Sequence, residues 1–133
     1  MENRFYTYSF EKLEVWQAAR VLKKSIYQIT QKFPREELFG LTSQIRKSTG
    51  SITANLAEGS GRASDKDRAH FTNIAYSSAL ETIDHFITAF DLEYLSEEMY
   101  VDHRLKLDEI INKLNSLYKY QIGRGENLKN LDI

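Results

Sequence analysis

Histidines and carboxylates are the residues of this chain that could hold a metal ion, and few of them have the required spacing. A di-iron site in a helical bundle needs a Glu from each of two helices and a Glu-x-x-His motif from each of the other two. Only Asp67 and His70 have a related spacing, and Glu81, Asp84 and His85 form one local cluster. Because two complete motifs are absent, we expect no metal site and no cofactor, with His85 bonded to a neighbour in a core or interface.

Nucleophilic catalysis has no recognisable centre in the sequence. There is no cysteine, and the serines form no Gly-x-Ser-x-Gly motif with a base and an orienting group. The stretch 59–62, Gly-Ser-Gly-Arg, could bind an anion at the start of a helix, but it lacks the Gly-Lys-Ser/Thr ending of a phosphate loop. A turn between helices is its commoner meaning. We therefore predict no catalytic residue, no enzyme activity and no small-molecule substrate.

Basic residues offer a different chemistry, the binding of phosphate groups. If subunits assemble into a ring, each cation is repeated around it, and a modest patch becomes a field that can hold a nucleic-acid backbone. The alternative is ordinary solubility, helped by neighbouring acids, and the residues alone leave both interpretations open. The candidate nucleic-acid-binding residues are Arg46, Lys47, Arg62, Lys66 and Arg68.

The helices that carry these residues have a small, polar seam where apolar residues are usual. Spacings of three and four residues place Ser48 and Asn55 on one stripe, and Ser78 on another. A polar group at a seam lowers stability unless it is hydrogen-bonded, so we expect a specific polar contact between two helices. Catalytic carboxylates are the disfavoured alternative, because no nucleophile or metal accompanies them. The predicted structural network contains Ser48, Asn55, Glu58, Ser78 and Glu81.

Four helical segments are predicted, at about 10–32, 34–58, 64–95 and from 96 to about 122. Pro34 separates the first two, and the glycines at 59 and 61 end the second. Ser64 and Ser96 are suitable N-caps for the last two. Short connections between helices of similar length predict an all-α fold, an up-down-up-down antiparallel four-helix bundle.

The third segment carries a second, bulky apolar stripe about 140° from its polar seam. A helix that is apolar over so wide an arc is buried on more than one side. We expect the excess to face another subunit, which predicts a homo-oligomer. The residues of this candidate interface are Tyr76, Leu80, Ile83, Ile87, Phe90 and Tyr94.

Length and composition bound the remaining possibilities. The 133 residues, 41% apolar and 28% charged, suit one globular domain. We expect an N-terminal tail at 1–9, a bundle at 10–122 and a flexible C-terminal tail at 123–133. Without a membrane-length apolar run or a signal peptide, the expected location is the cytoplasm, with no membrane partner. The net charge of −1 combines an excess of four cations in residues 1–80 with an excess of five acids in 81–133.

Three strings of sequence carry a resemblance to a known family. They are residues 44–48, Gln-Ile-Arg-Lys-Ser; residues 51–62, Ser-Ile-Thr-Ala-Asn-Leu-Ala-Glu-Gly-Ser-Gly-Arg; and residues 75–82, Ala-Tyr-Ser-Ser-Ala-Leu-Glu-Thr. Together with the opening at 10–19, they resemble the four-helix bundle family of 23S rRNA-intervening sequence proteins. The similarity covers about residues 10–120.

The resemblance implies a bundle that assembles as a homopentamer around a central channel. Some members are encoded within large-subunit ribosomal RNA genes. A related branch is the accessory protein of diversity-generating retroelements, in which a basic pentamer binds RNA and reverse transcriptase. Thr53 stands where the family usually has proline, and Tyr76 stands where arginine is common. The second departure removes a positive charge that RNA binding would use.

These observations predict a non-enzymatic, homopentameric accessory protein that associates with RNA through phosphate contacts. The alternative is an oligomeric scaffold with no nucleic-acid role, which would bind another protein through its acidic face between Glu93 and Glu109.

Overall fold

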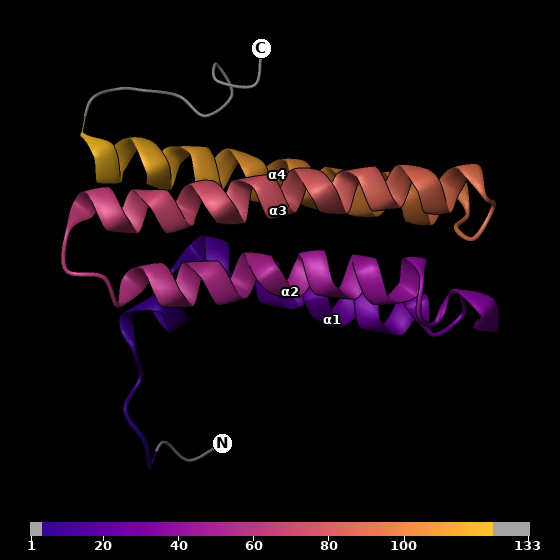
Figure 1. Ribbon diagram of the computed structural model, residues 1–133, viewed down its shortest axis with the longest axis horizontal. Helices are drawn as coiled ribbons and strands as arrows, with labels where there is room; N and C mark the ends of the chain where they lie inside the picture. The colour runs from indigo at the N-terminus through magenta and orange to yellow at the C-terminus, as the bar shows by residue number, and fades with distance from the viewer. Residues whose placement is uncertain (1–3, 124–133) are drawn as a thin grey trace.

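The computed structural model describes residues 4–123, and within that range the chain is all-α. The helices run antiparallel, up-down-up-down, with α1 and α2 forming one half of the bundle and α3 and α4 the other (Figure 1). Two short 3-10 turns precede α1 and α2. The elements are η1 (Ser9–Lys12), α1 (Glu14–Thr30), η2 (Arg35–Glu37), α2 (Leu41–Ser60), α3 (Asp65–Asp91) and α4 (Glu97–Ile122). The predicted four-helix bundle is confirmed.

Two helix starts follow the capping residues expected from the sequence. The Ser64 hydroxyl accepts a hydrogen bond from the Asp67 amide at 3.1 Å, and the Ser96 hydroxyl accepts one from the Met99 amide at 3.2 Å. Each satisfies a backbone donor that has no partner inside the helix. At the other end of α4, Gly123 is left-handed, with φ 67°. The rest of the predicted flexible tail lies outside the described residues.

The start of the second helix differs from the prediction. Pro34 precedes only the 3-10 turn η2, and α2 begins at Leu41. Its N-cap is Gly40, which has no side chain to offer, so a neighbouring residue does the capping. A carboxylate oxygen of Glu37 accepts a hydrogen bond from the Leu41 amide at 3.2 Å. The other oxygen accepts one from the Tyr94 hydroxyl at 2.8 Å, which ties this end of α2 to the turn after α3.

The core is built from apolar stripes along the helices. In α1 the buried residues repeat at spacings of three and four, and large side chains from α3 and α4, among them Phe86 and Leu107, fill the centre. The buried stripe that begins in α1 comprises Val15, Ala19, Leu22, Ile26, Ile29 and Phe33. Of the pairs of neighbouring helices, α2 and α3 pack most extensively, and α1 and α4 least.

Much of the bulky stripe packs within the subunit, so the predicted interface is wrong in part. Tyr76 is 3% exposed and cannot face another copy. Phe90 stacks on Tyr100 of α4 at 4.5 Å between ring centroids, and Tyr94 packs against Phe33 at 5.4 Å. The wide apolar arc has an intramolecular cause, because α3 packs against α2 on one side and α4 on the other.

Two residues of that stripe, Leu80 and Ile87, are exposed at 40% and 39%, while Ile83 packs partly against the core. The apolar surface of α3 therefore supports an oligomer less than the sequence suggested. None of the helices described in residues 4–123 has the length and apolarity needed to cross a membrane.

Candidate nucleic-acid interface

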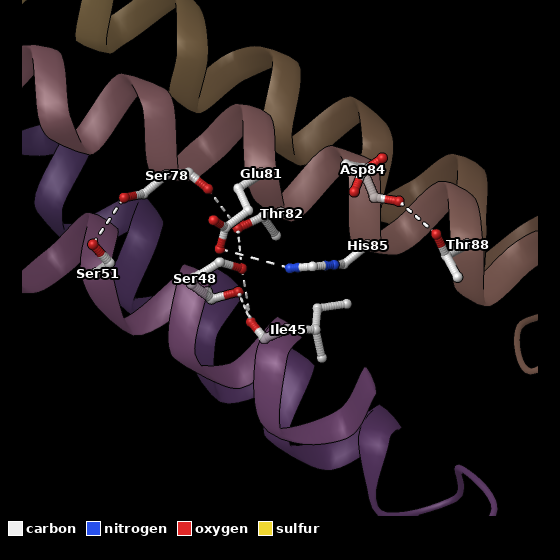
Figure 2. Close-up of polar contacts among 10 residues, drawn as sticks. Ile45, Ser48, Ser51, Ser78, Glu81, Thr82, Asp84, His85 and Thr88 are labelled. Carbon is white, nitrogen blue, oxygen red and sulfur yellow. Dashed lines mark hydrogen bonds and ion pairs between the residues drawn. The ribbon is translucent and has the colours of Figure 1, made fainter. Parts of the chain in front are cut away.

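Hydroxyl groups connect α2 and α3 across the predicted polar seam. Figure 2 shows Ser48 and Ser51 of α2 facing Thr82 and Ser78 of α3. The Ser48 and Thr82 hydroxyl oxygens are 2.8 Å apart, and so are those of Ser51 and Ser78. The Thr82 hydroxyl also donates to the Ser78 carbonyl at 2.8 Å. The expected polar contact between two helices is present.

Asn55 extends this network by one turn of α2. Its side-chain amide donates to the Ser51 carbonyl at 2.8 Å and to the Ser51 hydroxyl at 2.9 Å. Ser51 was missed in the sequence analysis, although it lies one turn from both Ser48 and Asn55. This helical spacing from two predicted seam residues could have identified Ser51 from the sequence.

The two carboxylates assigned to the network lie outside it, and that part of the prediction is wrong. Glu58 is exposed and pairs with Arg62 at 3.0 Å, one turn along the chain. The Glu81 side chain is 60% exposed, and its carboxylate lies 3.6 Å from Nε2 of His85 (Figure 2). Both carboxylates keep their hydration because they are exposed, while the small hydroxyls satisfy one another inside.

The histidines have structural partners. His103 is buried, with Nε2 2.8 Å from the Ser25 hydroxyl and Nδ1 2.8 Å from the Met99 carbonyl. Its ring stacks on Phe86. Within residues 4–123, no three His, Asp or Glu side chains are grouped as metal ligands.

The five predicted phosphate-binding residues fall into two separate groups. Arg46 and Lys47 lie in the middle of α2, whereas Arg62, Lys66 and Arg68 surround the turn between α2 and α3. The structure does not bring the groups together. The two groups also differ in how many of their cations already form ion pairs or hydrogen bonds within the protein.

At the α2–α3 turn, the cations have acidic neighbours. Arg62 pairs with Glu58 and lies over the Phe71 ring, 4.5 Å from its centroid. Arg68 pairs with Asp65 at 2.8 Å. Lys66 is exposed between Asp65 and Asp67. These carboxylates would repel a phosphate backbone, so this group is a weak candidate for nucleic-acid binding.

In the middle of α2, Arg46 is committed to the fold. Its Nε donates to the Thr30 hydroxyl at 2.9 Å, and one Nη donates to the Tyr27 carbonyl at 3.3 Å. The guanidinium also lies 4.7 Å from the centroid of the Tyr27 ring. Arg46 therefore anchors α2 to the end of α1, and it is less able to turn toward a ligand.

Lys47 is exposed, and α1 contributes further cations to the same half of the bundle. Arg20 and Lys24 of α1 are exposed, while Lys23 donates to the Thr53 hydroxyl at 3.2 Å. No ion pair to Arg20, Lys24 or Lys47 is found in the part of the chain that the structure describes. We call these three residues the α1–α2 cations.

Charge is divided between the two halves of the bundle. Helices α1 and α2 carry five Lys/Arg and two Asp/Glu, and α3 and α4 carry six Lys/Arg and ten Asp/Glu. The two acids of the first half, Glu14 and Glu58, lie at one end of it. Because α1 and α2 lie together on one side (Figure 1), the charge asymmetry along the sequence becomes a basic and an acidic side of the molecule.

Comparisons with known proteins agree with this architecture. The family model described as 23S rRNA-intervening sequence protein matches residues 11–116. A crystal structure from Bacteroides thetaiotaomicron, described as a protein with unknown function from the S23 ribosomal protein family, is similar at a TM-score of 0.73 and 27% sequence identity. The alignment covers 79% of this chain and 95% of that one. No curated protein matches.

Proposed function

The chain belongs to the family of 23S rRNA-intervening sequence proteins, and on that premise we propose that it is a non-enzymatic accessory protein that binds RNA. It works in the cytoplasm as a homo-oligomeric ring, and the family resemblance implies five copies. The RNA lies along the outer side of α1 and α2. The protein holds its phosphates and does not read its sequence.

The observation that carries this proposal is the division of charge across the bundle. An RNA backbone is attracted to the α1–α2 side and repelled by the acidic α3–α4 side, so the charge division fixes which side faces the polyanion. Repetition of the basic side around a ring would add its attraction several times over. A chain with near-zero net charge can then bind a strong polyanion.

The α1–α2 cations are best placed to make the phosphate contacts. Arg20, Lys24 and Lys47 are exposed, and the Arg20 guanidinium lies 5.6 Å from the centroid of the Trp16 ring. A long exposed side chain without an ion pair reaches a phosphate at little cost. Arg46 supports them by holding the two helices together. The contribution of Arg62, Lys66 and Arg68 is smaller, because neighbouring carboxylates oppose it.

A salt titration tests the proposal. A labelled oligouridine of about 12 nucleotides, a length suited to single-strand binding surfaces, is titrated with the wild type and with Arg20→Gln/Lys24→Gln/Lys47→Gln. Binding weakens as salt rises, and each phosphate contact removed lowers the slope of log K against log salt by about 0.7. The triple variant binds more weakly at low salt and has a flatter slope.

The matched control is Arg62→Gln/Lys66→Gln/Arg68→Gln, which removes the same charge from the α2–α3 turn. Its exposed ion pairs add little to stability, and it retains most of the wild-type affinity. Equal losses from the two triple variants would overturn the assignment to the α1–α2 side. Absence of wild-type binding at low salt would overturn the RNA function.

The second candidate function is a protein-interaction scaffold that uses the acidic side. Its support is the segment between Glu93 and Glu109, where six acids accompany two cations. A protein partner that co-purifies after nuclease treatment, and is lost when Glu97 and Glu98 are changed to Gln, would favour the scaffold. Loss of the partner on nuclease treatment favours RNA.

A further inference from the structure

A groove runs along α4 beside the start of α1, on the side where the bundle is most loosely packed. Its volume is about 690 Å³, and its apolar floor includes Leu13, Leu105 and Leu117. Leu105 is 64% exposed, which is unusual for a leucine beside an apolar groove. Burying such an apolar side chain is favourable, so an occupant that covers the groove is stabilised there.

The rim of the groove is mainly acidic. Glu14, Asp108 and Glu109 line it together with one cation, Lys113. Lys113 donates a hydrogen bond to Glu14 and lies 3.6 Å from Glu109. This hydrogen bond and charge lower the pKa of Glu14 and raise that of Lys113. Glu14 and Lys113 therefore keep their charges around neutral pH, and the acids of the rim outnumber its one cation.

The N-terminal arm, residues 4–8, has the complementary chemistry. It holds three exposed aromatic side chains, Phe5, Tyr6 and Tyr8, at 58%, 73% and 59%. The rings of Tyr6 and Tyr8 pack edge to face, with centroids 5.0 Å apart. The only charged residue of the arm is Arg4. An aromatic arm without acids suits an apolar groove with an acidic rim.

The arm is directed away from the groove of its own subunit. The Glu11 carboxylate accepts a hydrogen bond from the Tyr8 amide at 2.8 Å, and the Glu11 carbonyl accepts one from the Gln17 side chain at 2.9 Å. These bonds fix the turn at η1 against α1. Thr7 lies beside Trp16 and Arg20 on another face of α1, and Figure 1 shows the arm leading away from the four helices.

We propose that the N-terminal arm of one copy docks in the α1–α4 groove of a second copy. The lengths agree. From Leu105 to Leu117 a helix rises about 18 Å, and the arm spans about 13 Å when extended. Tyr6 and Tyr8 lie on one side of an extended segment and enter the groove together. The inference rests on the proposed assembly of copies and names the contact that joins them.

Because the arm and the groove are different surfaces, the contact is heterologous, which a ring requires. Two full-length variants separate its halves. Tyr6→Ala/Tyr8→Ala removes the aromatic arm and leaves the groove intact, whereas Leu105→Gln alters the groove and leaves the arm intact. The matched control is Leu92→Gln, since Leu92 is also exposed, at 49%, but lies outside the groove. Circular dichroism checks that each variant folds.

Sedimentation velocity over a range of concentrations measures self-association. We expect each of the two variants to dissociate at concentrations where the wild type and Leu92→Gln remain assembled. Mixing the two variants restores one working arm–groove pair, so the mixture forms one-to-one complexes that neither variant forms alone.

A wild type that stays monomeric overturns both the assembly and the arm contact. A wild type that assembles, with both variants assembling equally well, overturns the arm contact alone. Weakened variants that show no recovery on mixing also overturn it, since the two surfaces would then act separately.

Discussion

The hydroxyl oxygens of Ser48 and Thr82 lie 2.8 Å apart in the interior between α2 and α3. Thr82 is fully buried and Ser48 nearly so. Each hydroxyl is a polar group that would lower stability if left alone, and together they satisfy each other. The closest helix pair of the bundle is thus joined by matched polar groups as well as by apolar packing.

Thr82→Val should destabilise the protein by about 1–2 kcal/mol, because the substitution preserves shape but removes the hydroxyl that Ser48 contacts. Chemical denaturation measures the change. Thr88→Val is the control, since Thr88 makes a similar bond to a carbonyl of its own helix at an exposed position. Ser48→Ala added to Thr82→Val should cost less than the sum of the single changes. Strict additivity would contradict the coupling.

Gly59→Ala should also destabilise, by about 1–3 kcal/mol, through overpacking. A Cβ at Gly59 would lie 2.7 Å from Cβ of Phe71 on α3, which is too close without a shift of one helix. Gly50→Ala is the matched control in the same helix. Nothing lies within 4 Å of a Cβ there, so alanine should stabilise by about 0.5–1 kcal/mol. In thermal unfolding, the midpoint temperature should fall for Gly59→Ala and rise for Gly50→Ala.

Arg46→Lys should destabilise the fold by about 1–2 kcal/mol even though it keeps the charge. Lysine has no planar group with which to reach both the Thr30 hydroxyl and the Tyr27 carbonyl. Lys47→Gln, at the exposed next position, should change unfolding by less than about 0.5 kcal/mol. A stable Arg46→Lys variant would contradict the anchoring role given to Arg46.

Tyr94 should give the protein an alkaline dependence of stability. The hydrogen bond to Glu37 raises the pKa of Tyr94 above its ordinary 10.0, and burial and the charges of Glu37 and Glu36 raise it further. The folded-state pKa is the higher one, so the contribution is fully present below pH 10 and is lost as the pH rises through the folded-state value. Tyr94→Phe should lower the midpoint of denaturation at neutral pH and flatten its alkaline decline.

Tyrosinate absorbance checks the same assignment directly. Among the eight tyrosines, Tyr94 should ionise above its ordinary range, so the difference titration between the wild type and Tyr94→Phe should have its midpoint above pH 10. A midpoint at or below the ordinary value would show that the Glu37 bond does not persist in solution.

The sequence was sufficient to predict features that depend on near neighbours. The caps at Ser64 and Ser96 and the polar contact between the second and third helices follow from spacing along one helix. The start of α2 could not be predicted in this way, because its cap comes from Glu37, which Tyr94 holds from the far end of α3.

Burial and charge at the candidate sites depended on the arrangement of the helices. Two apolar stripes on one helix indicate two packing partners, but they do not show whether a partner is a helix of the same chain or another subunit. The burial of Tyr76 within the single chain shows that its partner is intramolecular. Arg46 and Lys47 are adjacent in sequence, yet only Arg46 finds acceptors on α1. The pairing of Arg62 and Arg68 with local acids, by contrast, follows from their spacing of four and three residues along the chain.

The loose packing between α1 and α4 has a consequence for local unfolding of the protein. The first and last helices meet where the packing is weakest, while α2 and α3 form the firmest pair. Partial unfolding should therefore begin with the separation of α1 from α4, while the α2–α3 hairpin stays packed. Backbone amides of α1 should exchange with deuterium sooner than those in the middle of α2 and α3.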